Sequence, residues 1–473
     1  MRVLFVYTFE ERPIELRRGS GSFSRFSEAR AKPLPFTWHT HLGVSYLASF
    51  LQANGCETEI LVLSTSLDKE LDTGVIDGVL DRFDPRLVCY TSVQREYSHV
   101  VRIAKYVKSR REDVFNLAGG PHIQLAPEQT IQDFDAICLG EGECPTLELV
   151  GQLKEGKAPS GIRNLWFRRG SEIEKNPTRE FMPDLDSLPF PDRKMWDPWI
   201  EFPGFAQQIL VSRGCPFQCT YCCNHAFQKI SEGKYVRFRS PENVMREIEH
   251  IVETIPIATR IYFESETFNV RTDYCLRFCQ HLERLWNDLG RRIDFGTNMR
   301  ITPRCDHAEL YSAMSRAGFS FINIGLESGS ERIRKFLKRY YSNADLLRSV
   351  GQAQDRGLAV NLYVMIGIPG ETYEDYKETL ELVKGARPRQ VYLSVCNPYA
   401  GTELRRAAEE MGLLSKDHDD EASRGRITFD LPGFPRDQIM EEYRMFHRRV
   451  GLADEKVAGA PITWSDSQAA ATA

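Results

Sequence analysis

The sequence QILVSRGCPFQCTYC, residues 208–222, joins a short apolar strand to a compact loop with three cysteines. The spacing of Cys215, Cys219 and Cys222 places three thiolates on one tight loop. Thiolates are the ligands that iron–sulfur clusters require. A four-iron cluster held by three cysteines keeps one iron open to bind and activate a small molecule. A zinc site completed by His225 is the alternative interpretation.

The sequence after this loop continues to alternate between strand and helix patterns. Apolar runs of strand length are each followed by a segment with helical periodicity. This order predicts a partial (β/α)6 barrel over residues 204–414, with its active site in the loops after the strands. The predicted strands are 208–212, 260–263, 293–296, 319–324, 360–366 and 391–395, and helices are expected near 241–254, 273–286, 308–316, 343–356, 373–384 and 402–411.

The N-terminal third also alternates, which predicts a doubly wound, Rossmann-like parallel sheet domain over residues 1–156. The whole chain is therefore expected to have an α/β fold. The predicted strands are 3–7, 60–63, 87–91, 115–118 and 136–139. The connection over residues 8–40 is far longer than usual, which fits either a mobile lid or disorder.

Two further segments show no alternation of strands and helices. Residues 157–203 are rich in proline and aspartate, which predicts a linker that packs along a surface. Residues 415–473 are predicted to form a charged C-terminal extension that ends in a frayed tail.

Composition excludes several classes of protein. The chain has 473 residues, 12 cysteines and a formal net charge of −5, which gives no support for nucleic-acid binding through bulk positive charge. No apolar run reaches the ~18 residues of a membrane span. No cleavage site follows the short apolar run at the N-terminus. We therefore expect a cytoplasmic protein, in which clustered cysteines more often bind metal than form disulfides.

The cysteine loop, with Tyr221 before its last cysteine, resembles the signature of the radical S-adenosylmethionine (SAM) enzymes. The resemblance implies a [4Fe–4S] cluster on Cys215, Cys219 and Cys222, whose open iron chelates the amine and carboxylate of SAM. It also implies reductive cleavage of SAM to a 5′-deoxyadenosyl radical, with an electron donor such as flavodoxin or ferredoxin.

Motifs after the later strands continue this resemblance. They imply that Glu266 binds the methionyl amine and that Arg300 pairs with the carboxylate through two hydrogen bonds. The turn at Glu327 and Ser328 matches the segment that contacts the ribose and carboxylate, and Gly367 and Gly370 match the adenine-contacting segment. The alternatives are a solvated acid at Glu266, a purely structural Arg300 and a helix cap at Ser328.

Two glycine-bearing turns follow strands of the first domain, and together they resemble a cobalamin-binding domain. The resemblance implies that both turns bind cobalamin. They contain Gly119, Gly120 and His122, and then Gly140, Glu141, Gly142 and Glu143. The Asp-x-His-x-x-Gly motif that supplies a cobalt ligand elsewhere is missing, so His122 is interpreted as a turn-forming residue or one that acts at a distance from cobalt.

The combined resemblance implies a cobalamin-dependent C-methyltransferase that acts on an unactivated carbon of a small molecule, such as a secondary-metabolite or lipid intermediate. One SAM would methylate cobalt, and a second would supply the radical that activates the substrate carbon. The alternative is a radical cyclase, mutase or oxidoreductase without methyl transfer. A methylthiotransferase and a non-catalytic cofactor-binding or sensor protein are disfavoured.

Overall fold

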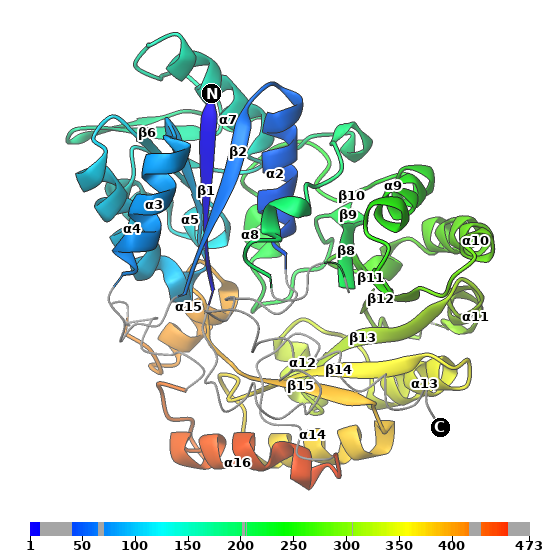
Figure 1. Cartoon of the computed structure of the whole chain (residues 1–473). Helices are drawn as coiled ribbons and strands as arrows, with labels where there is room; N and C mark the ends of the chain where they lie inside the picture. Colours follow the sequence, from blue (N-terminus) through cyan, green and yellow to red (C-terminus); the bar gives the residue numbers. More distant parts are fainter. Residues whose placement is uncertain are drawn as a thin grey trace.

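The computed structural model describes residues 1–9, 40–64, 71–200, 204, 206–304, 306–415 and 427–452. Two sheets organise this part of the chain. In Figure 1 the first sheet lies at the upper left and the second at the lower right. The predicted connection over residues 8–40 falls almost entirely outside the described residues.

The first sheet has the strand order β2-β1-β3-β4-β5-β6-β7. Its first five strands are parallel, as predicted. Successive residues of β1 alternate between two apolar cores, Val3 and Phe5 in one and Leu4 and Val6 in the other, because side chains of a strand point to opposite faces. The parallel strands are β1 (Arg2–Phe9), β2 (Glu57–Ser64), β3 (Leu87–Thr91), β4 (Phe115–Gly119) and β5 (Ala136–Cys138).

Helices cover both faces of this sheet, which makes it doubly wound. The helices α2 (Leu42–Ala53) and α7 (Glu143–Lys154) pack on one face, and α3 (Thr73–Phe83) and α4 (Tyr97–Arg110) pack on the other.

The sheet continues into the segment that was predicted to be a linker. The strands β6 (Leu165–Arg169) and β7 (Glu172–Lys175) pair antiparallel at its edge, so the sheet is mixed and the linker prediction was wrong for these residues. Leu165 and Phe167 of β6 are buried, but the arginines that follow them and the charged residues of β7 hide the strand pattern. Farther along, Trp196 is fully buried, and its Nε1 donates to Ser45 Oγ at 2.8 Å.

The second sheet confirms the six predicted units of the partial barrel. Its strands are all parallel, in the order β15-β14-β13-β12-β11-β8, and its two edge strands are β15 and β8. Apolar residues of the strands and surrounding helices form the largest core. The strands are β8 (Ala206–Leu210), β11 (Arg260–Glu264), β12 (Asp294–Met299), β13 (Phe319–Glu327), β14 (Ala359–Ile366) and β15 (Gln390–Val395); the helices include α9 (Pro241–Thr254), α10 (Thr272–Asp288), α11 (Ala308–Arg316), α13 (Asn343–Gln354), α14 (Tyr373–Ala386) and α15 (Glu403–Glu410).

The described part of the C-terminal extension is ordered structure packed on the barrel. The helix α16 (Arg436–Arg449) buries Ile439 and Phe446 in the largest core, and the predicted frayed tail at the end of the extension lies outside the described residues. Residues 416–426 and 453–473 lie outside the described residues. Among the helices that are described, none is long and apolar enough to cross a membrane.

Candidate active site

The cysteine loop begins at a turn that requires glycine. The strand β9 (Ser212–Arg213) pairs antiparallel with β10 (Arg237–Phe238), and Gly214 follows with a φ of +83°. A Cβ at this position would overlap the carbonyl oxygen of Tyr235. Farther along the loop, the backbone N–H of Cys222 donates to the carbonyl of Cys219 at 3.0 Å. This loop is therefore tightly turned, as predicted.

The three thiols of the loop have separate partners. Cys215 Sγ lies 3.7 Å from the hydroxyl of Thr267, and Cys219 Sγ accepts from Arg300 Nη1 at 2.9 Å. The Cys222 thiol has a lowered pKa, because the Cys223 thiol and the Asn224 amide donate to it.

The donor set of this loop fits an iron–sulfur cluster. Within the described residues no three histidine, cysteine or acidic side chains converge as they would around a single metal ion. A cluster has a different geometric requirement, since each cysteine binds a different iron atom. Three thiolates on one loop match that requirement, and the ligand roles of Cys215, Cys219 and Cys222 remain predictions.

Glu266 lies beside the cysteine loop, where a residue that binds the SAM amine is expected. Its Oε2 accepts from Asn224 Nδ2 at 2.9 Å, and Asn224 Oδ1 in turn accepts from the Tyr235 hydroxyl at 2.6 Å. The Glu266 side chain is accessible to solvent, although surrounding protein atoms raise the pKa of its carboxyl. A solvent-accessible carboxyl group beside the loop suits binding of an amine.

A buried network joins the loop to the end of β13. The Tyr221 hydroxyl donates to Glu327 Oε1 at 2.8 Å and accepts from Arg339 Nη1 at 2.9 Å. Arg339 is buried and also lies 3.4 Å from Glu327. The sequence did not predict a role for Arg339, because no motif links Arg339 to Glu327 or to Tyr221. The guanidinium carbon of Arg300 lies 3.9 Å from the centre of the Phe217 ring. This packing holds the guanidinium next to Cys219.

The two other turns predicted to contact SAM are held by their own side chains. Ser328 is fully buried, and its hydroxyl accepts from the Ser330 N–H at 3.2 Å. Ser330 directly precedes the helix α12 (Glu331–Phe336), so Ser328 is not the helix cap. After β14, Glu371 Oε2 accepts from the N–H groups of Gly367 and Ile368 at 2.7 and 3.2 Å. The contacts of Ser328, Gly367 and Gly370 with SAM remain predictions.

The first glycine turn of the N-terminal domain has the features expected beside a large ligand. A Cβ on Gly119 would meet nothing closer than Cys138 Cβ at 4.0 Å, whereas Gly120 has a φ of +95° and no room for one. His122 is buried, and its Nδ1 has no hydrogen-bond partner among the described residues. Burial lowers the pKa of this imidazole to about 4, which keeps it neutral. An unpartnered buried nitrogen at this sheet edge fits a cofactor site.

The second glycine turn contacts the barrel. Glu141 and Glu143 were expected to contact cobalamin; their carboxylates bind arginines of the barrel, and the cobalamin contacts of this turn remain predictions. Arg213 Nη1 and Nη2 lie 2.8 and 2.6 Å from Glu141 and Glu143, and Arg237 Nη1 lies 2.9 Å from Glu141. Gly140 has a φ of +86°, and a Cβ there would press on Asn164, so this glycine shapes the turn. Gly142 packs beside α2.

The carboxyl ends of the parallel strands in the two sheets lie next to each other. Gln94, just after β3, accepts from the Ala400 N–H beyond β15 at 3.3 Å. A Cβ on Gly401 would lie 3.1 Å from Leu125, which follows β4. Because parallel sheets bind ligands at this edge, the facing edges bring two expected ligand sites together.

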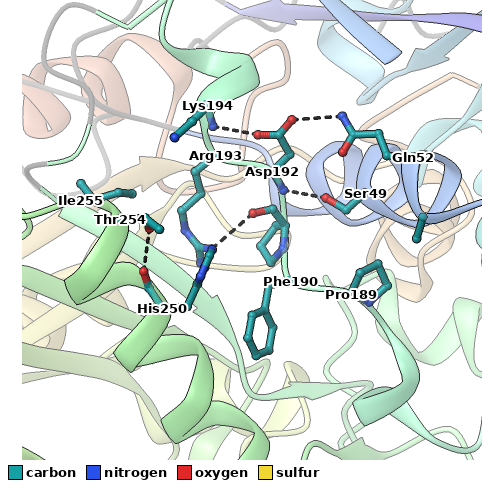
Figure 2. Close-up of a pocket in the computed structure, with 12 residues that line it drawn as sticks. Ser49, Gln52, Pro189, Phe190, Asp192, Arg193, Lys194, His250, Thr254 and Ile255 are labelled. Atoms are coloured by element: carbon teal, nitrogen blue, oxygen red, sulfur yellow. Dashed lines mark hydrogen bonds between the residues drawn. The ribbon is translucent and has the colours of Figure 1, made fainter. Parts of the chain in front are cut away.

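A separate cavity of about 390 Å³ lies away from this loop. Figure 2 shows it between α2, residues 189–194 and α9. Two of its charged groups have partners: Asp192 accepts from Gln52 Nε2 at 3.0 Å, and Arg193 pairs with Glu247 at 2.6 Å. The cavity is therefore part of the domain contact and not of the candidate active site.

Comparison with known families agrees with this arrangement. The family described as the Radical SAM superfamily matches residues 209–383, and the B12 binding domain matches residues 33–150. The first match spans β11 to β14 of the partial barrel, and the second spans β2 to β5 of the first sheet. The chain thus carries a segment that matches the B12 binding domain ahead of a segment that matches the Radical SAM superfamily.

Similar proteins include an uncharacterised methyltransferase, PH0819, from Pyrococcus horikoshii, 27% identical over 82% of this chain and 82% of the relative. The anaerobic magnesium-protoporphyrin IX monomethyl ester cyclase of Rubrivivax gelatinosus is 24% identical over 76% of this chain and 65% of the cyclase. The structure of the radical SAM methyltransferase TsrM from Kitasatospora setae, with cobalamin and a [4Fe–4S] cluster bound, has a TM-score of 0.68. It covers 98% of this chain and 93% of TsrM at 16% identity, which shows a shared fold.

Proposed function

We propose that this protein is a cobalamin-dependent radical SAM C-methyltransferase that acts on an unactivated carbon of a small molecule. The observation that carries the proposal is the contact between the carboxyl ends of the two sheets, beside which the cysteine loop begins. Arg213 directly precedes that loop and binds Glu141 and Glu143 of the B12-binding domain. A reaction that needs both cofactors near one substrate requires such proximity.

The chain's residues have distinct roles in this proposal. Cys215, Cys219 and Cys222 hold the cluster, Glu266 binds the SAM amine, and the turns at Gly119 and His122 border the cobalamin. When bound, the cluster supplies the electron that cleaves SAM, and cobalamin supplies the methyl group. Arg339 fixes Tyr221 and Glu327 beside Cys219, which keeps that side of the site rigid.

The finer assignments belong to the same proposal. The B12-binding unit comprises residues 1–156, and the radical SAM unit comprises residues 204–414. The electron donor is a flavodoxin or ferredoxin, and the reaction takes place in the reducing cytoplasm. A small-molecule substrate enters at the mouth of the partial barrel, because active sites of such barrels lie in the loops after the strands.

A second candidate is a radical cyclase, mutase or oxidoreductase without methyl transfer. Similarity to the anaerobic cyclase of Rubrivivax gelatinosus favours this alternative, since that relative is 24% identical to this chain. The two candidates share the cluster and the SAM site. They differ in whether a methyl group reaches the product.

Anaerobic reconstitution of the full chain with iron, sulfide and added cobalamin tests the proposal. After incubation with SAM and a reductant, we expect S-adenosylhomocysteine and 5′-deoxyadenosine in similar amounts. Formation of 5′-deoxyadenosine alone, with no cobalamin retained on the chain, would support the second candidate instead.

A further inference from the structure

The inner face of the barrel sheet has a continuous row of polar side chains. Tyr262 and Glu264 of β11 alternate with Ile261 and Phe263, which belong to the outer apolar core, so the first pair faces inward. The Tyr262 hydroxyl donates to Asn298 on β12 at 2.6 Å. Polar groups on the inner face therefore pair from one strand to the next.

The row continues through the remaining strands. Asn323 Nδ2 on β13 donates to the Tyr262 hydroxyl at 2.9 Å and lies 3.4 Å from the hydroxyl of Tyr363 on β14. The Tyr363 ring lies 5.1 Å from the Tyr392 ring on β15. Tyr363 is half-buried, and Ser394 on the same face of β15 is exposed, so a molecule from solvent can reach this face.

Glu264 has no cationic partner among the residues the structure describes, unlike Asp294 on the same face. The Glu264 side chain accepts one hydrogen bond, from Gln208 Nε2 at 2.9 Å. Arg260, on the same face of the strand, pairs with Asp294 at 3.5 Å. A carboxylate removed from water without a counter-charge is costly, and such groups cluster at binding and catalytic sites.

The pKa values of Glu264 and of the neighbouring tyrosines are raised, as expected for a buried carboxyl group without a cationic partner. Burial and the nearby Glu266 raise the pKa of Glu264 to about 7. Its charge also helps to raise the pKa values of Tyr262 and Tyr363, so the carboxylate and the two phenols lie within electrostatic reach of one another. Aromatic faces beside a carboxylate form a site that attracts cations.

We propose that Glu264 and the inward-facing tyrosines Tyr262, Tyr363 and Tyr392 bind a protonated nitrogen of the substrate. The substrate class is thereby narrowed to small molecules with an amine or another cationic nitrogen. This inference rests on the proposed function only in placing the substrate inside the barrel. A carboxylate or phosphonate in the same position would be repelled by Glu264.

Two probes of similar shape test this inference, one cationic and one neutral. Calorimetry would measure the binding of benzylamine and benzyl alcohol to the cluster-reconstituted full chain at neutral pH. We expect benzylamine to bind about 10-fold more tightly, which is about 1.4 kcal/mol. Equal affinity of the wild type for both probes would overturn the inference without any variant.

The Glu264→Gln variant should abolish the preference and change benzyl alcohol binding by less than about twofold. Glu309→Gln removes the same charge from an exposed position on α11 and should keep the preference. Iron content and thermal melting of each variant establish that it is folded. If Glu264→Gln does not fold, Gln208→Leu keeps the carboxylate and should retain the preference; loss of the preference there would contradict the assignment.

The outcome is distinguishable from failure of the proposed function. A chain that forms both SAM products but shows no amine preference keeps the methyltransferase proposal and excludes the amine site. A chain that prefers the amine but forms no S-adenosylhomocysteine keeps the amine site and excludes the methyltransferase proposal.

Discussion

Arg213 Nη2 lies 2.6 Å from Glu143 Oε1, across the boundary between the radical SAM domain and the B12-binding domain. Both side chains are largely buried. Arg213 is two residues from Cys215, so the same short segment bears the domain contact and the first cluster cysteine. The ion pair therefore fixes the position of the cysteine loop relative to the B12-binding turn.

Breaking this contact should destabilise the chain strongly. Arg213→Met leaves Glu141 and Glu143 buried without one of their cations, and removing one partner of a buried pair costs about 3–5 kcal/mol. Differential scanning calorimetry should show a lowered or split transition. The control Arg82→Met breaks the exposed pair with Glu59 and should cost no more than about 1 kcal/mol. Equal effects of the two variants would contradict the role of Arg213.

The cysteine assignment predicts a selective loss of the cluster. Cys219→Ala should abolish the visible absorbance of the reconstituted cluster and most of its bound iron, because one of three thiolate ligands is removed. Cys223→Ala is the matched control, since Cys223 is next to Cys222 but is not assigned as a ligand. An intact cluster in Cys219→Ala would contradict the assignment.

In the network around Arg339, the Tyr221 hydroxyl is expected to hold Glu327 in place. Tyr221→Phe removes the group that links Glu327 and Arg339, which should cost about 1–2 kcal/mol of stability. We expect SAM binding, measured by equilibrium dialysis, to weaken about 5- to 10-fold, because Glu327 loses its orienting donor. Tyr340→Phe, at a position 60% exposed, should change neither quantity. Unchanged SAM affinity in Tyr221→Phe would exclude the network from the SAM site.

Because the pKa of Glu371 is raised, we expect the folded chain to lose stability as the pH rises. Burial raises its pKa to about 8, with a further contribution from Asp375, and Arg332 opposes the shift. The folded chain therefore holds a proton that the unfolded chain releases at lower pH. Stability from this group is present in acid and falls by up to about 1.4 kcal/mol per pH unit until the pH passes the folded pKa.

Glu371→Gln replaces the protonated acid by a neutral amide and should remove this dependence. Urea unfolding at about pH 5.5 and about pH 8 would compare it with the wild type. The variant should gain stability relative to the wild type at the higher pH. Glu374→Gln, exposed on the first turn of α14, should follow the wild type at both values. A parallel pH dependence in wild type and Glu371→Gln would contradict the prediction.

Much of the fold could be predicted because its signals are local. The helices over residues 241–254 and 308–316 were predicted to the residue, since apolar periodicity marks them. The strands β6 and β7 were missed, because β6 has only two fully buried apolar residues, Leu165 and Phe167, and the edge strand β7 has a single apolar residue, Ile173.

The sequence by itself determined the cysteine loop, the two series of strands and helices, and hence the class of chemistry. Cysteine spacing and apolar periodicity are properties of neighbouring residues. Only the tertiary structure decided that Glu141 and Glu143 bind Arg213, that Arg339 supports Tyr221, and that Glu264 lies on the inner face without a cation. Such pairings join residues some 70 to 120 positions apart, and it is the packing of whole sheets and domains that brings them together.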